Sequence, residues 1–387
     1  MVYNLDLPKN NGELMVEILD TTLREGEQAP GVTFSLEEKL SIANLIDDFG
    51  VNIIEAGHPV VSEDVFNCVK IISNQGYNAD ILAHCRAKKE DIDLAISCDV
   101  DWVGIFFCVS KNRLNQHFKL ELNKAIDRIS STISYAKDHG LKVRYTPEDA
   151  TRTEYENLIL ASRAAVNAGA DRISIADTVG AMTPVKIYNL VKKIREDLNV
   201  KINVHCHNDL GLATANSLAA YEAGATLIDV TVNGIGERVG ITPLSEICLA
   251  LNCIYKIRNN WKLENLSQIS NVVSNYSGIN ISPNMPIVGE NAFLHKAGLH
   301  VSAVLNNPSH YELFPAELIG RKRDFILDKM SGAQTVRNKL EKMKVSADKD
   351  DVERILNYAK LKSKGKVTDN EILSFISDNR NENIMFQ

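Results

Sequence analysis

Two histidines one residue apart, His205 and His207, carry the sharpest signal for chemistry in the sequence. They close a short apolar run, which predicts a buried strand that ends in an H-x-H pair. Alternate side chains of a strand share a face, which sets the two imidazoles about 6–7 Å apart, close enough to hold one divalent ion. Cys206 between them is expected to face the opposite way. The alternative is a pair of histidines that only pack within the fold.

A second polar segment begins with Arg24 and Glu25, shortly after the apolar run 16–19. A carboxylate at such a strand end can hold a divalent cation while the neighbouring guanidinium faces an oxygen that becomes negative. Two histidines and one carboxylate form a ligand set that leaves coordination positions open for a substrate. We therefore predict a metal site made of Glu25, His205 and His207. The alternative for Arg24 and Glu25 is a plain surface ion pair.

The elements that must position these residues recur along the chain as apolar runs that alternate with helical patterns. Glycines stand at the ends of several of these helical patterns, as helix C-termini favour. The regular alternation predicts an α/β fold of the (β/α)8 TIM-barrel type rather than a doubly wound sheet, and no G-x-G-x-x-G opens the first helix. The eight predicted strands are 16–19, 52–55, 80–83, 102–108, 141–145, 172–176, 201–205 and 227–231.

Polar residues fall at the C-terminal ends of these predicted strands. Barrels of this kind carry their active sites on that face. Any one of the residues could have a structural role, but so many strand ends with polar or charged side chains predict a single site. The residues are Arg24, Glu25, Gln28, Glu55, His58, His84, Arg144, Thr146, Glu148, Asp177, Thr178, His205, His207, Asn233, Glu237 and Arg238.

Composition limits the class of protein. The 387 residues are 44% hydrophobic and 24% charged, as in ordinary globular proteins, and the net charge of −7 argues against nucleic acid or an anionic membrane as partner. No apolar run approaches the ~18 residues of a membrane helix. Seven scattered cysteines without C-x-x-C spacing predict reduced thiols in a cytoplasm. We expect a barrel over 1–258, a linker with a small helical subdomain over 259–289, and a mainly helical C-terminal subdomain over 290–387.

Three segments together resemble the isopropylmalate and homocitrate synthase family of metal-dependent TIM-barrel enzymes, which condense acyl-CoA with 2-oxo acids. They are DTTLREGEQ from Asp20, HCHNDLGLATAN from His205 and NGIGER from Asn233, and the likeness extends over about 16–332. The resemblance implies a divalent metal (Zn, Mn, Mg or Co) on the three predicted ligands. It also implies a 2-oxo acid that chelates this metal, with acetyl-CoA as the carbon nucleophile.

Within this family, the pocket residues resemble those of the homocitrate synthases. His84 matches the histidine that recognises the far carboxylate of 2-oxoglutarate, and Arg144 and Thr146 match residues that bind the same substrate. Ile241 stands where isopropylmalate synthases commonly place Asn, whereas Gly104 departs from the acidic residue of some homocitrate synthases. The resemblance implies homocitrate formation, the first step of lysine biosynthesis by the 2-aminoadipate route. Isopropylmalate synthase and citramalate synthase are the alternatives.

The resemblance also assigns catalytic groups. Arg24 and the metal would polarise the keto group, while His300, helped by Tyr311 and Glu148, would take a proton from the acetyl-CoA methyl. In the resembled family the segment that carries the histidine and tyrosine covers the barrel mouth of a second subunit, which implies a homodimer. Substrate contacts are expected from Arg24, Gln28, His84, Arg144, Thr146, Ala176 and Thr178.

Two other classes of protein remain open at this point. A metal-dependent lyase or aldolase could use the same ligand set, but it would not need the segment with His300 and Tyr311. A barrel that only binds other molecules would be expected to lack one of the three metal ligands, and all three are present.

Overall fold

The computed structural model describes residues 16–385, which fall into two compact units. The first contains residues 16–262 and 268–280, and the second contains residues 263–267 and 281–385. The division between the units therefore lies inside the segment 259–289 that the sequence predicts to be a linker. The three-part domain limits themselves stay a prediction.

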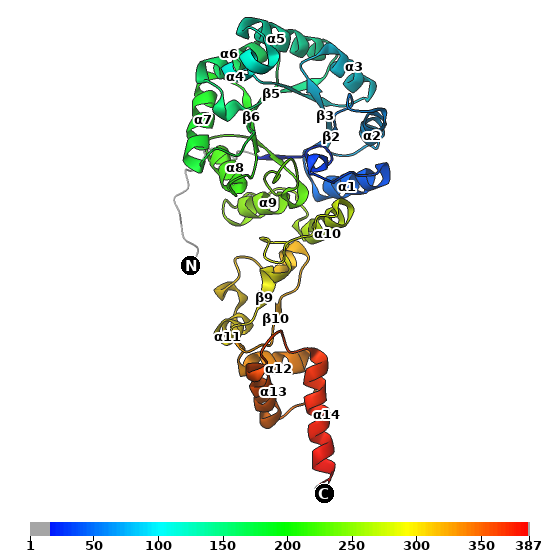
Figure 1. Cartoon of the computed structure of the whole chain (residues 1–387), viewed down its shortest axis with the longest axis vertical. Helices are drawn as coiled ribbons and strands as arrows, with labels where there is room; N and C mark the ends of the chain where they lie inside the picture. The colour runs from blue at the N-terminus through cyan, green and yellow to red at the C-terminus, as the bar shows by residue number, and fades with distance from the viewer. Residues whose placement is uncertain (1–15, 386–387) are drawn as a thin grey trace. The chain divides into compact units, whose positions relative to one another are not determined.

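Eight parallel strands of the first unit close into a barrel in sequence order, and β1 pairs with β8 to complete the ring (Figure 1). This confirms the predicted (β/α)8 fold, and each predicted strand overlaps one that the structure contains. The strands are β1 (Glu17–Asp20), β2 (Ile53–Gly57), β3 (Asp80–Arg86), β4 (Trp102–Phe107), β5 (Lys142–Pro147), β6 (Arg172–Asp177), β7 (Lys201–Cys206) and β8 (Leu227–Val230).

Helices surround the ring of strands, and their ends follow local sequence signals (Figure 1). In α1, Ser35 and Glu38 form a reciprocal capping box, and Gly50 ends the helix with φ of 102°. The helices of this unit are α1 (Leu36–Phe49), α2 (Glu63–Ser73), α3 (Lys89–Ser97), α4 (Lys111–Arg113), α5 (Leu122–Asp138), α6 (Tyr155–Asn167), α7 (Pro184–Asp197), α8 (Ala213–Glu222), α9 (Leu244–Cys253) and most of α10 (Leu266–Ser277).

The inner face of the barrel changes from apolar to polar along the strands. Leu19, Ile53, Leu82, Trp102 and Leu227 form one buried apolar cluster. Side chains of a strand repeat their direction every two residues. The residues two positions after this cluster therefore also face inward, toward the carboxyl ends of the strands. On several strands these residues are polar. These positions hold Glu55, His84, Arg144, Ser174, Asn203 and Asp229.

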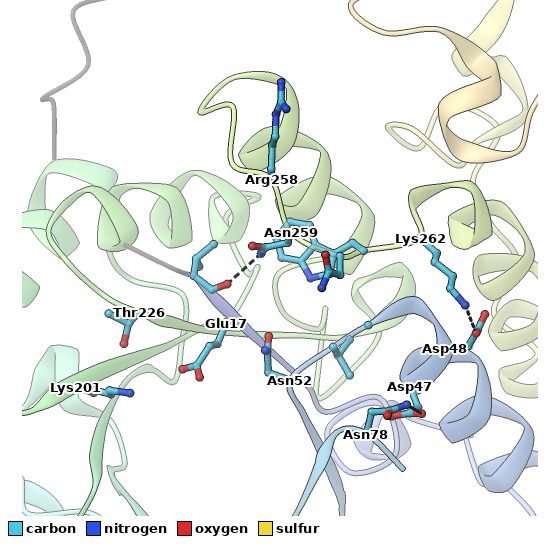
Figure 2. Close-up of a pocket in the computed structure, with 15 residues that line it drawn as sticks. Glu17, Asp47, Asp48, Asn52, Asn78, Lys201, Thr226, Arg258, Asn259 and Lys262 are labelled. Atoms are coloured by element: carbon cyan, nitrogen blue, oxygen red, sulfur yellow. Dashed lines mark hydrogen bonds and ion pairs between the residues drawn. The ribbon is translucent and has the colours of Figure 1, made fainter. Parts of the chain in front are cut away.

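The amino ends of the strands are held by the segment that follows α9 (Figure 2). The Asn259 Nδ2 atom donates to the backbone oxygen of Val16 at 3.1 Å, and Lys262 forms an ion pair with Asp48. The Trp261 ring stacks on Phe49 of α1 with centroids 6.5 Å apart. These contacts anchor the end of the barrel opposite to the polar strand ends.

The second unit has its own core and is mainly helical, as predicted. Strands β9 (Leu294–His295) and β10 (Asp324–Phe325) pair in parallel, and Leu327, Val336 and Ile355 belong to a buried apolar cluster. Among the described residues no helix is long and apolar enough to cross a membrane. The helices are α11 (Gly298–Asn306), α12 (Ala333–Lys342), α13 (Lys349–Leu361) and α14 (Asp369–Met385).

Candidate metal and substrate site

A pocket of about 250 Å³ opens at the carboxyl ends of the barrel strands. It brings together most of the predicted site residues of the barrel, from segments as far apart in sequence as the loop after β1 and the loop after β8, whereas the predicted residues Glu55, Asp177 and Asn233 do not line it. The lining residues are Arg24, Glu25, Gln28, His58, His84, Phe106, Arg144, Thr146, Glu148, Ser174, Ala176, Thr178, His205, His207, Asp229, Glu237 and Arg238.

The three predicted metal ligands converge in this pocket. Glu25, His205 and His207 are buried, and each offers a donor atom within 4.8 Å of the other two. Burial alone would raise the pKa of Glu25, but Arg24 and the two histidines bring it below its usual value, so the carboxyl group is ionised. Burial lowers the pKa of His207 to about 4, which leaves its imidazole neutral at pH 7. An anionic carboxylate and a neutral imidazole are the protonation states that a divalent cation requires.

The neighbouring Arg24 and the distant loop after β8 fix the orientation of Glu25. Its Oε1 atom accepts a hydrogen bond from the backbone N–H of Glu237 at 3.0 Å, and Arg24 donates to its other oxygen. A Cβ atom at Gly236 would lie 2.9 Å from the same Oε1, so the carboxylate needs a glycine there. The G-E dipeptide after β8 therefore builds part of the candidate metal site.

His205 is oriented by Asp229 of β8. The Nδ1 atom of His205 lies 3.0 Å from Asp229 Oδ2, which leaves Nε2 as the nitrogen available to a metal. The buried Nδ1 atom of His207 has no hydrogen-bond partner among the described residues. A buried polar atom without a partner is rare and calls for an explanation, and a metal ion bound there would supply one. The residues present thus fit a divalent cation.

Glu55 of β2 is the centre of a buried charge network. It accepts hydrogen bonds from Arg24 Nε at 2.8 Å, from Arg144 Nη2 at 2.9 Å and from the Thr21 hydroxyl, and it lies 3.1 Å from His84 Nδ1. Its side chain is fully buried, which would raise its pKa, but the two arginines and the histidine hold that pKa well below the usual range. Glu55 is therefore an anion that fixes four cationic or polar groups.

His84 is a neutral imidazole in this network. Burial and the nearby Arg24 charge lower the pKa of His84 to about 4. Because Glu55 is ionised, the short contact requires that His84 Nδ1 donates to it. The ring stacks on Phe106 with centroids 4.5 Å apart, which holds it at the pocket wall.

Arg144 crosses the barrel interior and is only 2% exposed. Its Nη1 atom donates to Asp229 Oδ2 at 3.2 Å and to Asn203 Oδ1 at 3.3 Å, while Nη2 donates to Glu55. Its Nε atom has no hydrogen-bond partner in the described part of the chain, and neither have the hydroxyls of Thr146 and Ser174. Three residues that line this pocket thus each carry a buried polar atom that calls for a partner.

The remaining predicted barrel residues lie at the rim or already have partners. Gln28 accepts from Arg24 at 3.1 Å, and Glu148 accepts from Arg113 at 2.8 Å. The Thr178 hydroxyl accepts from the backbone N–H of Asp149, and Ala176 is buried on β6. Their assignment to substrate binding or catalysis stays a prediction.

His300 and Tyr311 lie together in the second unit. Their rings stack with centroids 4.2 Å apart, and both side chains are exposed. Their neighbours Leu299 and Leu313 are 78% and 75% exposed, which is unusual for leucine. The ring nitrogen Nε2 of His295, by contrast, lies 3.1 Å from Glu312 Oε1.

Sequence reasoning did not single out Asp229 or Ser174, and it gave Glu55 no role beyond its place at a strand end. The alternation of side-chain direction along each strand could have pointed to these residues. Asp229 follows Leu227 by two residues on β8, and Ser174 precedes Ala176 by two on β6. Inward-facing polar residues below the strand ends are the feature that would have revealed this layer.

The chain matches two family models. The model described as HMGL-like matches residues 15–273, and the model described as homocitrate synthase post-HMGL domain-like matches residues 287–367. A homocitrate synthase from Pyrococcus horikoshii is 52% identical over 343 residues, which are 89% of this chain and 94% of that protein. A homocitrate synthase from Pyrococcus abyssi is 55% identical over 325 residues, which are 84% of this chain and 90% of that protein.

Solved structures with a similar fold include two lyases. The hydroxymethylglutaryl-CoA lyase from Pseudomonas aeruginosa superposes with a TM-score of 0.62 at 17% identity, over 69% of this chain and 94% of that chain. The HMG-CoA lyase from Brucella melitensis gives a TM-score of 0.60 at 17% identity, over 68% of this chain and 99% of that chain. At this identity the likeness concerns the fold alone.

A closed (β/α)8 barrel with an acidic residue and an H-x-H pair converging at its strand ends defines the class of HMGL-like enzymes, which the family match over the barrel bears out. The region after the barrel and the identity to curated relatives narrow this class further. The chain belongs to the homocitrate synthase family of acyltransferases.

Proposed function

We propose that this protein condenses acetyl-CoA with 2-oxoglutarate and hydrolyses the thioester, releasing homocitrate and CoA, with a divalent metal on Glu25, His205 and His207. The observation that carries the proposal is the pocket itself. It holds the three converging donor atoms and, in the same cavity, Arg144 and Thr146, each with a buried polar atom that has no partner in the described part of the chain. Such a cavity suits a small dicarboxylate that can chelate a metal at one end.

The metal end of the pocket supports polarisation of a keto group. When bound, the divalent cation supplies Lewis-acid chemistry to that group. Arg24 adds a fixed positive charge beside Glu25, and Glu55 and Glu25 raise its pKa, so it stays charged. A guanidinium held in place before the reaction stabilises the negative charge that develops on the keto oxygen. Thr178 and the backbone near Ala176 would hold the adjacent carboxylate, together with Gln28.

The opposite wall supports recognition of the far carboxylate. The unpaired Arg144 Nε and Thr146 hydroxyl are donors without acceptors in the described part of the chain. A branched apolar 2-oxo acid would leave these donors unpaired, which costs on the order of 1–3 kcal/mol for each group. A dicarboxylate would satisfy them. This difference favours 2-oxoglutarate over the 2-oxoisovalerate of isopropylmalate synthases.

The second unit supplies the proposed base. His300, with Tyr311 and Glu148, would take a proton from the acetyl-CoA methyl, and the resulting carbon nucleophile would form the new bond to the keto carbon. The alkoxide then takes up a proton, and water cleaves the thioester to a carboxylate and the CoA thiol. The exposed Leu299 and Leu313 beside these residues support contact with another protein surface. We infer a homodimer in which His300 and Tyr311 complete the site of the other subunit.

The cellular setting follows from the same proposal. We place the protein in the cytoplasm, where its seven cysteines would stay reduced, and the structure pairs none of them as a disulfide. Homocitrate made there would enter lysine biosynthesis by the 2-aminoadipate route.

The test is thiol release from acetyl-CoA with a panel of 2-oxo acids, combined with mass analysis of the product. We expect CoA and homocitrate in equal amounts from 2-oxoglutarate, and no turnover after the divalent metal is removed by chelation. Faster thiol release with 2-oxoisovalerate than with 2-oxoglutarate would instead identify an isopropylmalate synthase. Full activity after exhaustive chelation would refute the metal assignment.

A further inference from the structure

Asp229 of β8 is a buried carboxylate that two different parts of the site share. It is 1% exposed, and it contacts both the candidate metal ligand His205 and the pocket arginine Arg144. We propose that Asp229 is a positioning residue that couples metal affinity to recognition of the far carboxylate of the 2-oxo acid. The metal half of this inference rests on geometry, and the carboxylate half rests on the proposed function.

The contact with His205 orients a metal ligand. Asp229 Oδ2 lies 3.0 Å from His205 Nδ1, and a carboxylate can only accept there, so Nδ1 carries the proton. The lone pair is then on Nε2, which is the nitrogen left for the cation. A carboxylate behind a ligating histidine fixes its ring and raises its basicity, and its loss typically weakens metal binding about 10–100-fold.

The contact with Arg144 positions the opposite wall. Arg144 Nη1 lies 3.2 and 3.4 Å from the two Asp229 oxygens, and Asn203 Nδ2 donates to Oδ1 at 2.9 Å. The guanidinium is planar and rigid, so an anchor on Nη1 and a second anchor at Glu55 on Nη2 fix the direction of Nε. Asp229 therefore sets where the unpaired Nε donor lies in the pocket.

Because the Asp229 carboxylate contacts both His205 and Arg144, it links the two ends of the substrate site. A shift of Asp229 toward His205 or toward Arg144 changes the other contact, because both involve the same oxygen, Oδ2. Coupling between two binding events is reciprocal. Metal loading is then expected to order the arginine wall, and binding of the far carboxylate is expected to strengthen metal retention.

The first test is metal binding without substrate. Co²⁺ is titrated into the chelated full-length protein, and its visible absorption gives the dissociation constant for wild type and for Asp229→Asn. The amide keeps the size of the side chain but removes the charge, and we expect Co²⁺ binding to weaken about 10–100-fold. The matched control is Asp80→Asn, which removes another ion-paired strand aspartate, bonded to Lys142 at 2.7 Å, that contacts none of the metal ligands. Equal Co²⁺ affinity in wild type and Asp229→Asn would overturn the proposal.

The second test is substrate selectivity at saturating metal. We expect the ratio of kcat/KM for 2-oxoglutarate over 2-oxoisovalerate to fall at least ~10-fold in Asp229→Asn, because the far carboxylate loses an aligned donor. An unchanged ratio would refute the coupling even if metal binding were weaker. If wild type did not use 2-oxoglutarate, the proposed function would fail, whereas the Co²⁺ titration would still decide the metal half. If Asp229→Asn does not fold, Asp229→Glu is used in its place, because it keeps the charge but displaces it. We expect Asp229→Glu also to weaken Co²⁺ binding and to lower the ratio of kcat/KM.

Discussion

A methyl group added at Gly104 would press directly on the buried guanidinium of Arg144. A Cβ atom built there would lie 2.9 Å from Arg144 Nη2 and 3.1 Å from Leu82 Cδ2. Arg144 cannot yield freely, because Nη2 is bonded to Glu55 at 2.9 Å and the side chain is 2% exposed. The available relief is a shift of the guanidinium away from Glu55. Loss of one hydrogen bond to a charged group costs about 1.5–3 kcal/mol, so kcat/KM for 2-oxoglutarate should fall roughly 10–150-fold in Gly104→Ala.

The assay is steady-state thiol release with 2-oxoglutarate, together with urea unfolding to show that the variant is folded. The control is Ile105→Val, which removes a methylene from the next residue of β4, whose side chain faces the other way. We expect this control to keep kcat/KM within about threefold of wild type, with a stability loss of about 0.5–1.5 kcal/mol. If Gly104→Ala were as active as the control, the tight fit around Arg144 would not matter and the reasoning would be refuted.

Three further predictions concern the metal, pH and assembly. His205→Ala should abolish both metal retention, measured by elemental analysis, and turnover; a variant that retains stoichiometric metal would contradict the ligand assignment. Burial raises the pKa of Asp20 from 3.8 to about 7, so the folded state binds this proton more tightly than the unfolded state. The resulting stability is complete below pH ~4 and is lost as pH rises through ~7, which amounts to about 3 kcal/mol between pH 5 and pH 8. Urea unfolding should show this decrease in wild type but not in Asp20→Asn, and identical decreases would rule the explanation out. Mixing Glu25→Ala with His300→Ala chains, each inactive alone, should restore activity at about one of the two sites per heterodimer if the groups act in trans. No recovery despite proven subunit exchange would place them in cis.

Much of the fold could be predicted because its physical signals are local. Each strand of the barrel is a short apolar run, and capping residues such as Ser35 and Gly50 mark the helix ends. The convergence of Glu25 with His205 and His207 also followed from position, because strand ends of a parallel barrel meet on one face.

The charge network below the strand ends could not be predicted in the same way. Glu55 looks like one more polar residue at the end of a strand, but its partner Arg24 comes from the loop after β1 and its partner Arg144 comes from β5. Which arginine reaches which carboxylate depends on barrel register and on the space left by Gly104, neither of which is local to the sequence. Asp229 escaped notice because an aspartate inside an apolar strand has no motif around it.

The most direct test of the account is a crystal structure of the protein with Co²⁺ and 2-oxoglutarate, with the metal located by its anomalous scattering. The account predicts one cobalt ion bound by Glu25, His205 and His207, with the keto-acid end of the substrate on that ion. It also predicts the far carboxylate within hydrogen-bond distance of Arg144 Nε and Thr146. A cobalt ion bound elsewhere, or a far carboxylate directed away from those two donors, would contradict it.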